Sequence, residues 1–356
     1  MSRPAVPIYV MGLGASTPVG RDAWSSAAAV RAGISGFTQH PFMIDSAGEP
    51  MRAAIAPWLE IECHGQDRFE ALLFPAINQA LAPVDAAGQS GLRIGLAIGL
   101  PTPRPGLPEG LGSAIRASVA KRYAGRFVAT AALESGHAAA LLGLYSTVSK
   151  MENGAFDACV VAGVESYLAP ETLEWLEAND QLHGAGPLNN AWGFIPGEGA
   201  GAALLVSERA LPRLQVGPMA QVLSVGRAVE PNRIKTETVC IGEGLTTAFR
   251  EALSGLPAGS AVTDMYCDMN GEPYRADEFG FATLRTKEFF ESASDFVAPA
   301  DCWGDVSAAS GVLGFVLSVI AAGKAYSKGD LAFLWASSET GERGTALLSM
   351  PATQRA

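Results

Sequence analysis

The residues that could do chemistry in this 356-residue chain are few and lie far apart. Five cysteines are scattered without a Cys-Xaa-Xaa-Cys pair, and none of the four histidines lies at metal-ligand spacing from another. A cysteine thiolate could act as a nucleophile, and a histidine as a base or a ligand. The dispersed thiols indicate a reducing, cytoplasmic location, and the spacings predict neither a metal site nor a cofactor.

One segment joins a reactive residue type to a recognisable local pattern. Residues 127–130 predict a strand, and an apolar helix pattern follows that reaches about Lys150. Between them, residues 130–137 read Thr-Ala-Ala-Leu-Glu-Ser-Gly-His, a sharp junction between strand and helix. A sharp turn between a strand and a helix can present a nucleophilic side chain. The residue that the junction presents therefore decides which chemistry is open to the chain.

The rest of the chain must position that junction, and its strand and helix patterns alternate. Such alternation implies βαβ units and mostly parallel sheets. Strands are predicted at residues 8–11, 94–99, 127–130, 157–163, 202–206, 265–269, 331–335 and 346–350. Helices are predicted at residues 24–32, from the junction to about 150, at 245–256, at 279–292 and after 311.

Composition excludes several classes of protein. A hydrophobic share of 48% with 17% charged residues is typical of a globular chain rather than a disordered one. The net charge of −11 argues against nucleic acid and anionic membranes as partners. The most apolar run, residues 312–322, is too short to span a bilayer and is expected to form a buried helix.

Several motifs, in order along the chain, resemble those of the β-ketoacyl synthases. Residues 11–20 resemble the opening strand and turn of that family, and residues 161–166 resemble its strand ending in Gly-Gly-Xaa-Glu. Most specific are residues 193–201, which are similar to the family's Gly-Phe-Xaa-Xaa-Gly-Glu-Gly-Ala-Gly. The chain is therefore identified as a β-ketoacyl-synthase-like member of the thiolase-like superfamily.

The resemblance implies a fold as well as a family. It implies an α/β chain with the thiolase-like fold, in which two similar halves stack as five α-β-α-β-α layers. The N-terminal half, which carries the junction, is expected at residues 1–210, and the C-terminal half at residues 211–356. The family also implies a dimer that joins sheets across a two-fold axis.

The family's reaction needs one cysteine and two histidines, and the resemblance implies that all three are replaced here. Matched to the family's motifs, Ala132 stands at the cysteine, Asn270 at the first histidine and Asp305 at the second. An alanine methyl cannot attack a thioester, and an ionised aspartate cannot donate a hydrogen bond to an oxyanion. The resemblance therefore implies a site without the family's catalytic triad.

Further residues belong to the pocket that the resemblance implies. His137 is expected to have a buried structural role, and a catalytic role is the alternative. Cys302, like Cys267, is expected to be a small buried hydrophobe, and a replacement nucleophile is the alternative.

Carboxylates surround the same implied pocket. Glu134, Glu272 and Asp305 would approach it if the motif matches hold. Together they could bind a cation or an amine, or hold a proton. The simpler interpretation, which we favour, is that they are solvated or salt-bridged acids.

These residues lead to three hypotheses about function. The first is a non-catalytic β-ketoacyl-synthase-like protein that acts by binding or assembly in fatty acid or polyketide biosynthesis. Its partner would be a second copy of the chain or a related active synthase, with an acyl carrier protein or an effector protein as further partner classes. The second is an acyltransferase with altered active-site chemistry. The third is an accessory or scaffold protein of a bacterial system such as type VI secretion.

Overall fold

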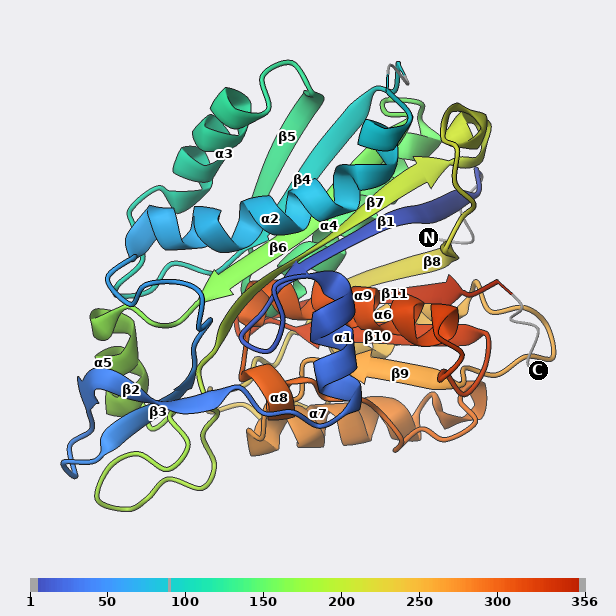
Figure 1. Cartoon of the computed structure of the whole chain (residues 1–356). Coiled ribbons are helices and arrows are strands. Elements are labelled where there is room, and N and C mark those ends of the chain that lie inside the picture. The colour runs from blue at the N-terminus through green and yellow to red at the C-terminus, as the bar shows by residue number, and fades with distance from the viewer. Residues whose placement is uncertain (1–5, 89–90, 352–356) are drawn as a thin grey trace.

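Nine strands form one mixed sheet in the computed structural model, which describes residues 6–88 and 91–351 (Figure 1). In spatial order these strands are β5 (Phe127–Glu134), β4 (Ile94–Leu100), β6 (Ala158–Ser166), β7 (Glu198–Ser207), β1 (Ile8–Ser16), β8 (Ala220–Val229), β11 (Glu342–Ser349), β10 (Leu331–Ser337) and β9 (Asp264–Cys267). A separate two-stranded sheet pairs β2 (Phe37–Ile44) with β3 (Pro50–Ala54). In the large sheet the first five strands come from the N-terminal part of the chain and the last four from the C-terminal part.

The large sheet is not mostly parallel, and that expectation was wrong. Only the pairs β4–β5, β4–β6 and β9–β10 run parallel within the described residues. The other neighbouring pairs are antiparallel. The physical reason is that β7 returns along β6 after a long excursion, while β10 and β11 form a hairpin across a short turn.

Two apolar helices fill the space between the two groups of strands. Within the described part of the chain, strands of the two groups pair with each other only where residues 8–10 of β1 pair with residues 220–222 of β8. Helix α4 (Ala139–Glu152) packs against β4 and β6 of one group and against β8 and β11 of the other. Helix α9 (Ser310–Gly323) packs likewise against β7 and β10.

The burial of α9 follows from its composition. All of its residues from Gly311 to Ala322 are buried, as expected for a helix that is apolar on every side. The sequence-based expectation of a buried helix in this run is confirmed. Among residues 6–88 and 91–351, no helix combines the length and apolar character needed to cross a bilayer.

Further helices cover the outer faces and complete the layers. Helix α2 (Gly65–Ala86) covers β1, β6 and β7, and α3 (Leu111–Arg122) packs on β5. Helix α6 (Glu243–Leu253) covers β8 and β11, with α7 (Pro273–Leu284) beside it. The expected five α-β-α-β-α layers are therefore confirmed, whereas the boundary between halves at residue 210 stays a prediction. The structure also contains the helices α1 (Ala23–Arg31), α5 (Pro170–Ala178) and α8 (Ala300–Trp303).

Some elements differ from the sequence-based expectations. Helix α2 and strand β8 were not predicted, and α2 contains Pro75 and Pro83, which interrupt a helix pattern. The helix expected at residues 279–292 begins earlier, at Pro273, because proline fits the first helical turn. This earlier start matters for the site, since it moves the residues after Pro273 into a helix.

The glycine-rich motif at residues 193–201 lets two backbones touch. A Cβ atom on Gly197 would lie 2.1 Å from the carbonyl oxygen of Trp303, so only glycine fits. The Gly197 amide donates to the carbonyl of Asp305 (2.9 Å), and the Asp305 amide donates to the carbonyl of Ile195 (2.8 Å). The motif therefore fixes the backbone that carries Asp305.

This backbone contact makes a stability prediction. Gly197→Ala is expected to lower the free energy of unfolding by about 1–3 kcal/mol or more, because the new methyl overlaps a carbonyl oxygen. The matched control is Gly280→Ala in α7, where nothing lies within 4 Å of the added Cβ. Urea denaturation of both variants checks this, and equal stability of the two would contradict it.

Candidate functional site

Three segments that are far apart in the sequence bring His137, Asn270 and Asp305 together. Gly136, with a φ of 61°, turns the chain from the end of β5 toward α4, and His137 follows in the 3₁₀ turn before that helix. Asn270 lies just after β9, and Asp305 lies just after α8. His137 is 4% exposed and Asp305 is 3% exposed, so their polar atoms must find partners inside the protein.

Asp305 accepts hydrogen bonds from several sides. His137 Nε2 lies 2.9 Å from Oδ2 and 3.1 Å from Oδ1 of Asp305. Asn270 Nδ2 donates to Oδ2 (2.5 Å), and the backbone amide of Ser307 donates to Oδ1 (2.7 Å). The Asp305 carboxylate therefore joins the junction before α4 to the segment after β9.

The pKa of the Asp305 carboxyl lies well below its ordinary value. Burial by itself raises this pKa, but the charge and hydrogen bond of His137, followed by Arg275 and Asn270, outweigh it. Asp305 is therefore ionised at neutral pH and accepts hydrogen bonds without donating any. A carboxylate at this position opposes the charge of a developing oxyanion.

Arg275, in the first turns of α7, neutralises the site from the opposite side. Its Nη1 donates to Asp268 Oδ2 (2.8 Å) and to the carbonyl of Ser337 (3.0 Å). Its Nη2 lies 3.0 Å from the same His137 nitrogen that faces Asp305. Because a guanidinium only donates and a carboxylate only accepts, this nitrogen can satisfy one of them at a time.

Glu272 extends the network toward the surface. Its carboxylate accepts from Asn270 Nδ2 (2.9 Å) and from the Tyr274 hydroxyl, and it pairs with Lys235 Nζ at 3.0 Å. Burial raises the pKa of Glu272, but the charges of Arg275 and Lys235 outweigh it and hold the pKa below its ordinary value. Glu272 and Asp305 are thus paired acids, as the simpler interpretation held.

Ala132 and Glu134 lie elsewhere. Side chains alternate along a strand, and Ala132, which pairs with Ile98 in the neighbouring strand, packs with the cluster between β4, α2 and α3. Glu134 faces the same way, and its Oε1 accepts from the Gly112 amide of α3 at 3.0 Å. The structure does not bring either side chain to Asn270 and Asp305, because the chain turns only at residues 135–136.

The two cysteines nearest to the site are poor nucleophiles. Cys302 lies buried in α8, and burial raises the pKa of its thiol, with the charge of Asp301 adding to the effect. Cys267, at the end of β9, is buried as well, and burial raises the pKa of its thiol well above the ordinary value. A protonated, buried thiol is inert, so both behave as the small hydrophobes that we expected.

A cavity of about 220 Å³ opens beside Asn270 and Asp305. Its lining includes Phe37, His183 and Ile195, and none of the described residues that line it is a cysteine, a serine or a threonine. The polar side chains that line the cavity are therefore the carboxylates of Asp301 and Asp305, the amide of Asn270 and the imidazole of His183. Such a lining suits hydrogen-bond donors or cations better than acyl transfer.

Two buried ion pairs lie at the neighbouring ends of β6 and β7. Arg68 pairs with Glu198 and Arg104 pairs with Glu165, each at 2.6 Å and almost fully buried. Glu198 also accepts from the Ser166 hydroxyl (3.0 Å). These acids belong to the motifs at residues 161–166 and 193–201, so the motifs serve the fold here.

Sequence reasoning missed Arg275 and Lys235. The sequence does contain a signal for Arg275. The Asn-Gly pair and Pro273 mark the start of a helix, where residues three apart, such as Glu272 and Arg275, lie on one face. Lys235 had no local signal. It reaches Glu272 from an irregular segment, and only the tertiary fold brings the two together.

The Asp305 network predicts a pH-dependent loss of stability. Asp305→Asn removes one partner of a buried charged network and is expected to lower the free energy of unfolding by about 3–5 kcal/mol at pH 7. Because the pKa of Asp305 is lowered on folding, this difference from the wild type is complete above the unfolded-state pKa and shrinks as the pH falls below about 4.

Denaturation curves at several pH values check this prediction. The control is Asp301→Asn, since Asp301 is exposed and lines the same cavity. It is expected to change stability by less than about 0.5 kcal/mol. A pH-independent loss in Asp305→Asn would show that the carboxylate charge is not what the network uses.

Comparison with known proteins places the fold. No protein-family model and no curated protein matches the chain. A chain of the AntDE:AntF complex, a type II polyketide synthase acyl-carrier protein with its ketosynthase, aligns with a TM-score of 0.78 and 16% identity over 97% of this chain and 99% of that chain. The ishigamide ketosynthase/chain length factor aligns with a TM-score of 0.69 and 20% identity over 97% and 99%. The module 6 ketosynthase of the bacillaene synthase from Bacillus subtilis 168 aligns with a TM-score of 0.73 and 15% identity. The alignment covers 98% of this chain and 72% of that chain. The chain therefore has the thiolase-like fold of the ketosynthases.

Proposed function

We propose that the chain is a non-catalytic ketosynthase-like protein that acts by binding, paired with a related synthase or with a second copy of itself. The observation that carries this proposal is the charged network around Asp305. It holds His137 between a carboxylate and Arg275, and none of the described residues that line the adjoining cavity is a cysteine, a serine or a threonine. A site built this way can recognise a ligand, but it lacks the groups for acyl transfer.

We also propose that His137, rather than Ala132, stands where an active synthase holds its cysteine. His137 follows the turn at the start of the α4 segment and lies beside Asn270 and Asp305, the residues matched to the family's two histidines. Ala132 lies on the opposite face of the sheet from α4. The motif match in this segment then shifts by five residues, and the conclusion that the cysteine is missing stays the same.

The neighbouring structures support a synthase or a carrier protein as partner. One pairs a ketosynthase with a chain length factor, and another holds an acyl carrier protein with its ketosynthase. In this chain β5 is the end strand of the large sheet, and Val128 on it is 57% exposed. An uncovered apolar edge strand is open to pairing with another chain, so we place the partner interface there.

The absence of acyl chemistry can be tested directly. The purified protein is incubated with acyl and malonyl thioesters, and its intact mass is measured. We expect no added acyl mass and no condensation product, in the wild type and in His137→Ala alike. An adduct on the wild type that disappears in His137→Ala or in Cys302→Ser would overturn the non-catalytic proposal and favour an acyltransferase with altered chemistry.

The interface can be tested by changing the edge of β5. Val128→Lys is expected to lower the molar mass in solution from that of a pair to that of a single chain, because a charge would be buried against the partner strand. The control is Val216→Lys, at a residue that is 46% exposed and outside the large sheet. Light scattering after size exclusion measures the mass, with the wild type examined both alone and with a synthase from the same source. The proposal is contradicted if the wild type has the molar mass of a single chain both alone and in the presence of the synthase.

A further inference from the structure

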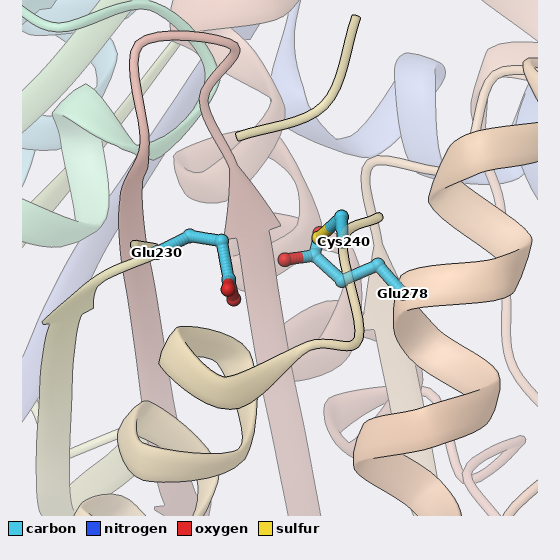
Figure 2. A group of neighbouring side chains, drawn as sticks. All are labelled: Glu230, Cys240 and Glu278. Carbon is cyan, nitrogen blue, oxygen red and sulfur yellow. The ribbon is translucent and has the colours of Figure 1, made fainter. Parts of the chain in front are cut away.

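A second cluster of reactive side chains lies away from the Asp305 network. It consists of Glu230, just after β8, Cys240, in the segment before α6, and Glu278, in α7. One carboxylate oxygen or sulfur from each lies within 4.8 Å of the others. Figure 2 shows the Glu278 carboxyl group beside Cys240 and reaching toward Glu230.

The two acids of this cluster are buried, and one oxygen lacks a partner. Glu230 and Glu278 are each 1% exposed. Glu230 Oε2 accepts from the Gly244 amide at the start of α6 (2.7 Å), but its Oε1 has no hydrogen-bond partner. A buried carboxylate oxygen without a partner is costly, and a second carboxylate close by increases the cost.

One arginine neutralises only part of the charge. Arg343, which is fully buried, donates through Nε to Glu278 Oε1 at 2.6 Å. When both carboxyl groups are ionised, two carboxylates beside one guanidinium leave a net charge of −1. With a divalent cation bound and the thiol of Cys240 deprotonated, the charges of the cluster sum to zero. A bound cation would thus balance the excess negative charge of the cluster and would give Glu230 Oε1 a partner.

We propose that Glu230, Cys240 and Glu278 bind a zinc-type divalent cation. Carboxylate oxygen and cysteine sulfur are ligands that Zn²⁺ accepts at about 2.0–2.3 Å, and a tetrahedral ion leaves its fourth position for water. Cys240 is only half-buried, so solvent can supply the ion and the water. Cation binding releases the thiol proton, as is general for cysteine sites.

The ion would tie an irregular segment to the Asp305 network. Lys235 lies in the same segment as Cys240 and pairs with Glu272 (3.0 Å) and with Glu339 (2.6 Å). Both ends of this segment are then anchored, one by ion pairs and the other by the metal. Cation binding therefore holds Lys235 against Glu272, whose neighbours Asn270 and Gly271 line the cavity beside Asp305.

The histidine and cysteine spacings of the sequence do not predict this site. Its ligands come from positions far apart and contain no histidine. Only the fold brings α7 against the segment before α6, so no local spacing could have revealed the cluster.

Zinc titration of the chelator-treated full chain tests the proposal. Calorimetry with ZnCl₂ is expected to show one equivalent bound per chain and a melting temperature that rises with zinc. Cys240→Ser and Glu230→Gln are each expected to weaken binding by about tenfold or more. The control is Cys63→Ser, another half-buried free cysteine, which should bind like the wild type.

Two further measurements keep the test decisive if a variant folds poorly. Co²⁺ added to the wild type should give a thiolate-to-metal absorption band that is absent in Cys240→Ser. Hydrogen exchange at residues 231–242 should slow with zinc in the wild type and stay unchanged in Cys240→Ser. Failure of the wild type to bind zinc, or equal binding in Cys240→Ser and Glu230→Gln, overturns the proposal in favour of a proton-sharing carboxyl pair.

Discussion

The structure around the site depends on one buried charge, the guanidinium of Arg275. It is almost fully buried, and it contacts the segment after β9, the last residue of β10 and the turn before α4. Burying a charge is costly unless it is paired and fully hydrogen-bonded, so each of these contacts is needed by the others. The two groups of strands therefore meet at this guanidinium as well as across the apolar middle layer.

The same constraint determines which groups the site can offer to a ligand. A synthase needs groups that donate to a growing negative charge, whereas here a carboxylate occupies the middle of the network. This carboxylate, of Asp305, already accepts hydrogen bonds from His137, Asn270 and the Ser307 amide. A site whose polar atoms are so fully engaged is rigid, and what it offers to the cavity is shape and negative charge.

The fold could be predicted from the sequence where a motif reflects a close backbone contact or a buried position. The glycines of residues 193–201 allow contacts that a Cβ would prevent, and the apolar run of residues 312–322 reports burial. The site could be predicted only in part. Asn270 and Asp305 lie together as expected, but β5 extends to Glu134, so the turn lies later in the chain than predicted, and Ala132 lies away from both residues. The prediction of mostly parallel strands was also wrong. Alternating strand and helix patterns do not distinguish a parallel crossover connection from a long connection between antiparallel strands.

The position of α9 in the chain has a consequence for biosynthesis. This helix covers strands of the N-terminal group, yet it ends at Gly323, so it leaves the ribosome long after those strands have been made. Until then, the apolar face of β6 and β7 that α9 will cover stays exposed to other chains. Nascent chains with such a face are prone to aggregation and are typical clients of chaperones. The middle layer that stabilises the finished protein is therefore also what delays its N-terminal strands from completing their fold during translation.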